Sequence, residues 1–167
     1  MDYAFPFIES LDQFLALLKN PLSYREVEKD GYVVFNYNGL NPDNFPPVQD
    51  AGDAAIRECR GIAFSKATGE IISRPFHKFF NVNERDETQD HRVDLSQPHA
   101  ILEKLDGSMI APFYVNGEMI WGTKMGATDV AKPVEEFVAL RPHYRQFAEY
   151  VIERGYTPIF EWCSRKQ

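Results

Sequence analysis

The sequence predicts an α+β domain in which mainly antiparallel sheets are flanked by a few helices. Short runs of β-branched and aromatic residues recur between turn signals, as the strands of hairpins do. The strongest hairpin signal is Asn116-Gly117, which separates the expected strands 108–114 and 118–123. Apolar side chains recur at helical spacing in residues 10–19 and 134–153.

The first third of the chain is expected to contain one helix, one strand and one loop. Residues 10–19 have Ser10 as a candidate N-cap and Asn20-Pro21 beyond the last helical turn. Residues 32–37 are rich in β-branched and aromatic side chains and are expected to form a strand. Residues 38–54 carry several Gly and Pro turn signals, which predict a loop.

The middle of the chain is expected to alternate short strands with turns and one long exposed loop. Residues 67–69 should form a turn, and the polar and charged residues 83–99 should form the loop. A tight turn is expected at Asp106-Gly107, directly after the last strand of this part. The expected strands are residues 59–64, 70–73, 75–80 and 100–104.

The last third is expected to add two helices and a final strand to the hairpin. Arg141-Pro142 should divide residues 134–153 into two helices, because proline disfavours a helix across that position. Gly155 is a suitable C-cap residue, and residues 157–163 should form the final strand. The apolar stripe of the two helices is expected to comprise Val134, Phe137, Val138, Phe147, Tyr150 and Val151.

The composition indicates one soluble domain and excludes several classes of protein. The chain has 167 residues, of which 44% are hydrophobic, so it can bury a core and wholesale disorder is excluded. No apolar run approaches the roughly 20 residues that span a bilayer, and the N-terminus lacks the basic region of a signal peptide. We therefore expect a cytoplasmic protein without a membrane partner. Cys59 and Cys163 fit neither a metal site nor a disulfide framework, as is usual in a reducing compartment.

The charge is unevenly distributed along the chain. The formal net charge is −7, which argues against a general basic surface for nucleic acid. Residues 1–55 contain nine acidic and three basic residues, so the rest of the chain is close to neutral. The later two thirds can therefore present positive charge locally.

A candidate reactive centre lies in residues 103–108, Glu-Lys-Leu-Asp-Gly-Ser. Lys104 ends an expected strand, and the turn after it offers backbone N–H groups and the Ser108 hydroxyl to an anion. The same residues also fit an ordinary surface lysine beside a turn, in which Asp106, Gly107 and Ser108 serve the turn geometry.

Three further stretches are informative together with that one. They are E-C-R-G-I-A-F at 58–64, R-P-F-H-K-F-F-N at 74–81 and I-F-E-W at 159–162. Each alone has a purely structural interpretation. In this order the four stretches resemble the ATP-dependent RNA ligases of the phage T4 RNA ligase 1 group, within the covalent nucleotidyltransferases. The resemblance extends from about Tyr32 to the last residue and implies an incomplete nucleotidyltransferase domain, similar to an ATP-grasp-like ligase domain.

The resemblance implies that Lys104 is the nucleophile that attacks the α-phosphorus of ATP and forms lysyl-AMP. This attack requires a neutral amine, whereas a free lysine is almost wholly protonated near neutral pH. Neighbouring cations oppose a further positive charge and favour the neutral amine, and they also offset charge on the phosphates. Arg60, Lys78, Lys124 and Mg²⁺ are the expected sources of that field.

The resemblance also implies roles for other residues of the site. Arg60 and Lys78 match residues that contact phosphate or the nucleic-acid end, and Glu161 matches a glutamate that contacts the ribose. Tyr37 takes the place of an aromatic residue near the nucleotide pocket, and Glu103 lies on the strand that lines the adenine. No metal ligand is expected, because the histidines lack ligand spacing. They are His77, His91, His99 and His143.

The chain departs from the family pattern at its C-terminus. It ends at Gln167, before a family motif whose glutamate holds the catalytic metal and before a Lys-x-Lys strand that grips the α-phosphate. We therefore expect 1–167 to be a single truncated adenylylation domain, weak or inactive unless a second polypeptide supplies these motifs. The expected partners are RNA 5′-phosphate and 3′-hydroxyl ends, including those of tRNA. The alternatives are a non-catalytic module that binds nucleotides or RNA 5′-phosphates, and an enzyme for DNA ends or a GTP-dependent cap.

Overall fold

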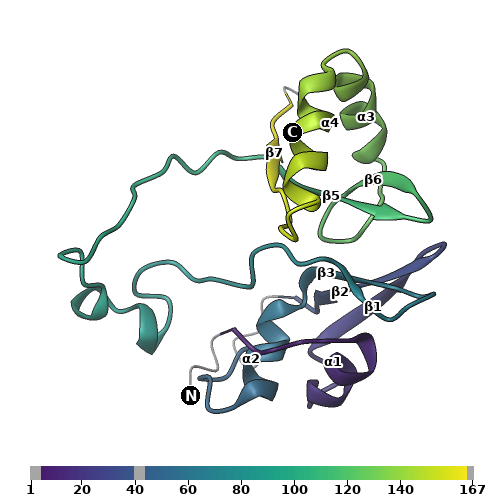
Figure 1. Ribbon diagram of the computed structural model, residues 1–167. Helices are drawn as coiled ribbons and strands as arrows, with labels where there is room; N and C mark the ends of the chain where they lie inside the picture. Colours follow the sequence, from purple (N-terminus) through teal and green to yellow (C-terminus); the bar gives the residue numbers. More distant parts are fainter. Residues whose placement is uncertain (1–4, 40–43, 165–167) are drawn as a thin grey trace.

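Two layers of helices enclose two layers of sheet in the computed structural model, which describes residues 5–39 and 44–164 (Figure 1). A long loop between the two sheets projects away from the layers (Figure 1). All pairings between strands are antiparallel, which confirms the α+β prediction. Residues 40–43, part of the loop expected over 38–54, lie outside the described residues. The helices are α1 (Leu11–Leu17), α2 (Ala51–Glu58), α3 (Ala131–Ala139) and α4 (Pro142–Ile152).

The first sheet has the strand order β1-β2-β3-β4, and its alternating side chains serve two cores. On β2, Val33 and Phe35 pack toward α1 and α2, whereas Tyr32 and Val34 face the second sheet. This division follows from the two-residue period of a strand. The strands of this sheet are β1 (Tyr24–Glu28), β2 (Tyr32–Tyr37), β3 (Arg60–Ser65) and β4 (Ile71–Ser73).

The second sheet has the order β6-β5-β7 and also lies between two cores. Phe113 faces the first sheet, where its ring meets that of Tyr32 edge-on at 5.2 Å between centroids. Ile110 faces the opposite way and packs with Trp121 and Val138 beneath α3 and α4. The strands are β5 (Ser108–Val115), β6 (Glu118–Gly122) and β7 (Phe160–Trp162).

Elements with a specific local signal are confirmed. The side chain of Ser10 caps α1 by accepting the backbone N–H of Gln13. Asn116 and Gly117 have φ of 51° and 83°, the positive values that a two-residue hairpin turn needs. Pro142 begins α4 and separates it from α3. Gly155 follows α4 with φ of 78°.

Two short elements were not predicted. The loop expected over 38–54 contains the start of α2, which begins after Asp50, whose carboxylate accepts the backbone N–H groups of Gly52 and Asp53 at 2.8 and 3.0 Å. Cys59 is the C-cap of this helix, so the strand expected from 59 begins one residue later. The edge strand β1 was not predicted because charged side chains interrupt the alternation of apolar and polar residues that is typical of a strand.

Two expected strands are wrong. Residues 75–80 have no regular structure, because Pro75 opens the segment and the N–H of Lys78 donates to the carbonyl of Arg57 at 2.7 Å instead of joining a ladder. Residues 100–104 are exposed and pair with no strand in the described part of the chain.

Other expectations needed smaller corrections. The loop expected over 83–99 is confirmed as exposed and holds only two short 3₁₀ turns, Asp86–Thr88 and Asp90–Arg92. The strand expected over 157–163 shortens to β7. On α4, Phe147 and Tyr150 are exposed instead of forming the apolar stripe, and the small Ala148 enters the core between them.

Candidate functional site

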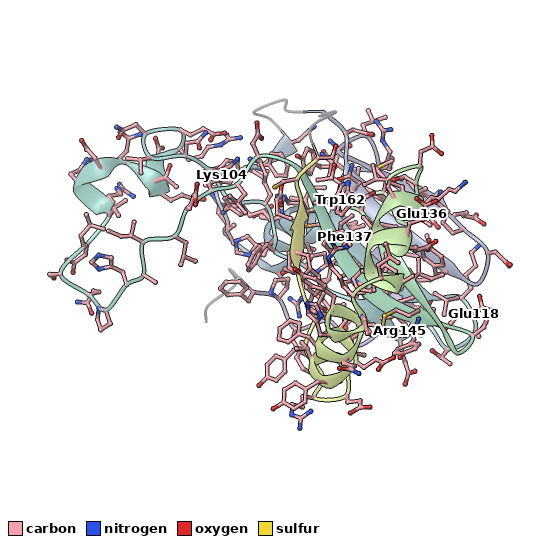
Figure 2. The ribbon with its side chains drawn as sticks, turned by 90° about the horizontal axis from the view of Figure 1, so that it is seen from above. Lys104, Glu118, Glu136, Phe137, Arg145 and Trp162 are labelled. Atoms are coloured by element: carbon pink, nitrogen blue, oxygen red, sulfur yellow. The ribbon has the colours of Figure 1, made fainter. Side chains whose placement is uncertain are left out.

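A cavity of about 630 Å³ opens between the start of β3, the segment that enters β5, and β7. It brings together residues that lie far apart in the sequence. Figure 2 shows Lys104 at the place where the long loop returns to the sheets. The predicted site residues that line this cavity are Arg60, Glu103, Lys104, Asp106, Gly107, Ser108, Lys124 and Glu161.

Arg60 is held at one wall of the cavity without a carboxylate partner among the described residues. Its guanidinium donates to the carbonyl of Phe76 at 3.3 Å and contacts the sulfur of Met109 at 3.5 Å. It also lies over the ring of Phe79, 5.1 Å from the centroid. These contacts fix the direction of the side chain and leave its positive charge available to an anion.

Lys124 is brought beside Arg60 by a close approach of two backbones. Gly61, the next residue on β3, has φ of 103°, and a Cβ on it would stand 3.0 Å from the Cα of Lys124. The glycine of the E-C-R-G stretch therefore lets the segment after β6 lie directly against β3. The exposed ammonium of Lys124 lies over the ring of Tyr37, 5.5 Å from the centroid.

Lys104 lies on an exposed, irregular segment, and no hydrogen bond or ion pair involves its side chain within residues 5–39 and 44–164. The expected tight turn at Asp106-Gly107 is instead a bend through which the chain enters β5. A Cβ on Gly107 would collide with the carbonyl oxygen of Trp162. Glycine is thus needed here for the approach of β7, not for a left-handed turn.

The pairing of β7 with β5 delivers Glu161 to the cavity. In this antiparallel register Glu161 stands opposite Met109, and Trp162 stands opposite Ser108. The ring of Trp162 packs edge-on against Phe137 of α3 at 5.4 Å, which anchors β7 (Figure 2). Glu161 is exposed and faces the cavity that Lys104 also lines.

Lys78 and Tyr37 were predicted as site residues but do not line the cavity. The ammonium of Lys78 donates to the carbonyl of Phe79 at 2.8 Å and lies 4.4 Å from the centroid of Phe80. Burial lowers the pKa of Lys78, and the nearby cations, among them Arg60, lower it further against the opposing effect of Glu84. Tyr37 is connected to the cavity through Lys124, whose ammonium lies over its ring.

The structure adds aromatic and cationic residues that sequence reasoning missed. Phe76 and Phe79 line the cavity beside Arg60. The ring of Phe80 is approached by the guanidinium groups of Arg57 and Arg85, 5.2 and 4.7 Å from its centroid, as well as by Lys78. The sequence signal for these residues was the run of aromatic side chains around Lys78. Because residues 75–80 were interpreted as a strand, the run was not recognised as part of the site.

Groups of three or more His, Cys, Asp or Glu residues placed to hold a metal ion are absent from the described residues. Both cysteines are free thiols, and burial raises the pKa of Cys59 far above its ordinary value. Within the same residues no helix is long and apolar enough to cross a bilayer.

The cavity gathers exposed lysines, a glutamate and an arginine that has no acidic partner among the described residues, a set of side chains that suits a phosphorylated ligand. Residues 58–167 match the family model described as RNA ligase, of the T4 RNA ligase 1 type, and this match covers more than half of the chain. The chain therefore belongs to that RNA ligase family. The match includes every predicted site residue except Tyr37.

Curated relatives agree with this family. The chain is 39% identical over 157 residues to a "Putative RNA ligase" of Thermovibrio ammonificans, a match that covers 93% of this chain and 39% of the relative. It is 31% identical over 122 residues to a "Putative bifunctional polynucleotide kinase/RNA ligase" of Autographa californica nuclear polyhedrosis virus, covering 70% and 16% of the two chains. It is 35% identical over 72 residues to RNA ligase 1 of Bacteriophage TS2126, covering 41% and 18%. The matched region thus spans about two fifths or less of each relative.

Proposed function

We propose that this chain carries the adenylylation site of an ATP-dependent RNA ligase. Lys104 loses a proton to water, and its Nζ attacks the α-phosphorus of ATP. A phosphorus–nitrogen bond forms as the bond to pyrophosphate breaks, which leaves lysyl-AMP and free pyrophosphate. In the complete reaction AMP passes to an RNA 5′-phosphate, and a 3′-hydroxyl then displaces it to seal the two ends.

The observation that carries the proposal is the meeting of Lys104, Arg60, Lys124 and Glu161 around one cavity. The two cations would offset the charge of the triphosphate, and the Glu161 carboxylate would accept a hydrogen bond from a ribose hydroxyl. Fixed charges of this kind are each worth about 10²- to 10³-fold in rate when they face developing charge.

Mg²⁺ would accompany ATP and supply further neutralisation of its phosphates, since magnesium in such sites is held largely by substrate phosphates and water. Glu103 and Asp106 are the cavity carboxylates that lie within two residues of Lys104 in the sequence, and one or two carboxylates suffice to hold such an ion.

The proposal is tested by incubating the chain with Mg²⁺ and ATP labelled at the α-phosphate, then denaturing the protein and measuring the retained label. ATP labelled at the γ-phosphate is the matched control. Adenylylation predicts retention of the α-label alone, at the low level expected of residues 1–167 without a second polypeptide. Retention of the γ-label, or of neither label while the chain still binds ATP, contradicts the proposal and favours phosphorylation or a non-catalytic binding module respectively.

Replacing Arg60 by alanine is expected to slow α-label incorporation by about 10²- to 10³-fold, because it removes a fixed positive charge from the cavity. The initial rate of labelling at saturating ATP measures the effect. Arg145→Ala is the control, since Arg145 pairs with Glu149 on the outer surface of α4 (Figure 2). Equal rates for the two variants would exclude a role for Arg60 in the reaction.

A further inference from the structure

A second cavity, of about 390 Å³, adjoins the first and shares Phe76, Phe79 and Ile159 with it. Its other aromatic walls include Phe5, from the N-terminal segment, and Tyr156, from the segment after α4. We call it the aromatic cavity. Its volume lies within the range of ligand-binding pockets in proteins.

Arg74 fixes the floor of the aromatic cavity. Its guanidinium makes two hydrogen bonds to the carboxylate of Glu58, at 2.9 and 3.0 Å, and the Glu58 side chain is only 3% exposed. The same guanidinium donates to the carbonyl of Pro6 at 2.9 Å, and the backbone N–H of Arg74 donates to the hydroxyl of Thr157 at 2.9 Å. These bonds join the two segments that carry Phe5 and Tyr156, so hydrogen bonds hold the cavity in shape. The charge of Arg74 at its floor is neutralised by Glu58.

The walls of the aromatic cavity are unusually exposed for aromatic side chains. Tyr156 is 71% exposed, Phe5 66% and Phe76 61%. Large aromatic rings of this kind are normally buried, and single exposed ones need no explanation, whereas a group gathered around one hollow indicates a binding surface. Phe76 and Phe79 meet edge-on at 6.5 Å, which leaves ring surface free for a planar ligand.

A cation, Arg60, lies beside the aromatic rings of Phe76 and Phe79 where the two cavities meet. Arg60 lies over Phe79 and donates to the carbonyl of Phe76, so a phosphate at Arg60 would lie next to the aromatic walls. A phosphate beside a planar aromatic group is the repeating pattern of a single-stranded nucleic acid. Proteins that bind such strands combine positive charge along the backbone with aromatic rings on which bases stack.

We propose that the aromatic cavity holds an unpaired base of the RNA strand whose 5′-phosphate end lies in the first cavity. The inference rests on the proposed function, because that function supplies the RNA end. Stacking accepts any base, since every base has a π-face, so this contact would strengthen binding of single-stranded ends with little sequence preference.

The experiment compares Tyr156→Ala with Tyr150→Ala, using fluorescence anisotropy of a 5′-phosphorylated single-stranded RNA labelled at its 3′ end. Tyr150 is a similarly exposed tyrosine on α4 that does not line the aromatic cavity. Tyr156→Ala should weaken binding about tenfold, the size of one lost stacking contact, and Tyr150→Ala less than about twofold. Phe5→Ala provides a second variant from the opposite wall.

A second RNA, with abasic sugars at the three nucleotides nearest the 5′ end, identifies the contact. It should bind the unaltered chain as weakly as the normal RNA binds Tyr156→Ala, and the tyrosine variant should not weaken it further. Unchanged affinity of Tyr156→Ala, or equal losses with normal and abasic RNA, would overturn base stacking and favour a protein partner for this surface.

Incorporation of α-label from ATP is measured on the same preparations. Tyr150 lines neither cavity, so Tyr150→Ala should incorporate label as the unaltered chain does. Absence of label in the unaltered chain would count against the proposed function, whereas a normal label with unchanged RNA binding would count against the aromatic cavity alone.

Discussion

Replacing Lys104 by alanine is expected to abolish covalent labelling by ATP, with a loss of at least about 10³-fold, because the proposal assigns the phosphorus–nitrogen bond to the amine of this side chain. Lys104→Arg should fail equally, since a guanidinium keeps its proton and is a poor nucleophile near neutral pH. Both variants should still bind ATP if Arg60 and Lys124 provide most of the attraction to the phosphates. Gel detection of the α-label and isothermal titration of ATP measure the two properties separately.

Lys132→Ala is the matched control for the Lys104 variants. Lys132 is an exposed lysine on α3 and does not line the cavity. Substitution of either exposed lysine should change the free energy of unfolding by less than about 0.5 kcal/mol, so a lost label cannot come from misfolding. If Lys104→Ala retains the label and peptide mapping finds it on Lys78 or Lys124, the assignment of the nucleophile is wrong.

The sequence proposed candidate members of the site but not their arrangement. The resemblance to the RNA ligases proposed Lys104, Arg60 and Glu161, and these line one cavity. Their meeting depends on the register between β5 and β7, which the sequence does not express. Lys78 was expected at the phosphates, but its ammonium is held against Phe80. The motif that contains Lys78 indicated that this residue lies close to the cavity, but it did not indicate the direction of the side chain.

The fold was predictable where a local signal decides the structure. Asn116-Gly117 requires positive φ at both residues, and Pro142 cannot continue a helix, so neither result depends on distant contacts. Residues 75–80 and 100–104 have apolar side chains in strand-like order, but a strand also needs a partner. The structure offers neither segment a partner strand within the described residues, and both remain irregular.

The two glycines of the motifs show the same division between local and distant causes. Gly107 appeared as a turn residue, yet the atom that excludes a side chain there is the carbonyl oxygen of Trp162. At Gly61 a side chain is disfavoured by a local cause and a distant one. The residue has positive φ, and it also faces the backbone of Lys124. The contacts with Trp162 and Lys124 join residues far apart in the sequence, so they can be seen only in the folded structure.

Replacing Gly61 by alanine is therefore expected to reduce both stability and labelling. A non-glycine residue at φ of 103° is strained by about 1–3 kcal/mol, and its Cβ would lie 3.0 Å from the Cα of Lys124, closer than packed carbon atoms tolerate. Relief of that contact requires the Lys124 segment to move away from β3, at a further cost of about 1–3 kcal/mol. The summed loss of about 2–6 kcal/mol is large beside the stability of a typical domain.

Gly117→Ala separates the two causes, because Gly117 also has positive φ, at 83°, but no atom lies within 4 Å of the position of its Cβ. This control should lose only the conformational part, about 1 kcal/mol, and keep the labelling rate. Urea unfolding and initial rates of α-label incorporation are measured on both variants. If Gly61→Ala is no less stable than Gly117→Ala and labels at the same rate, the close approach of β3 to Lys124 does not position the cations of the site.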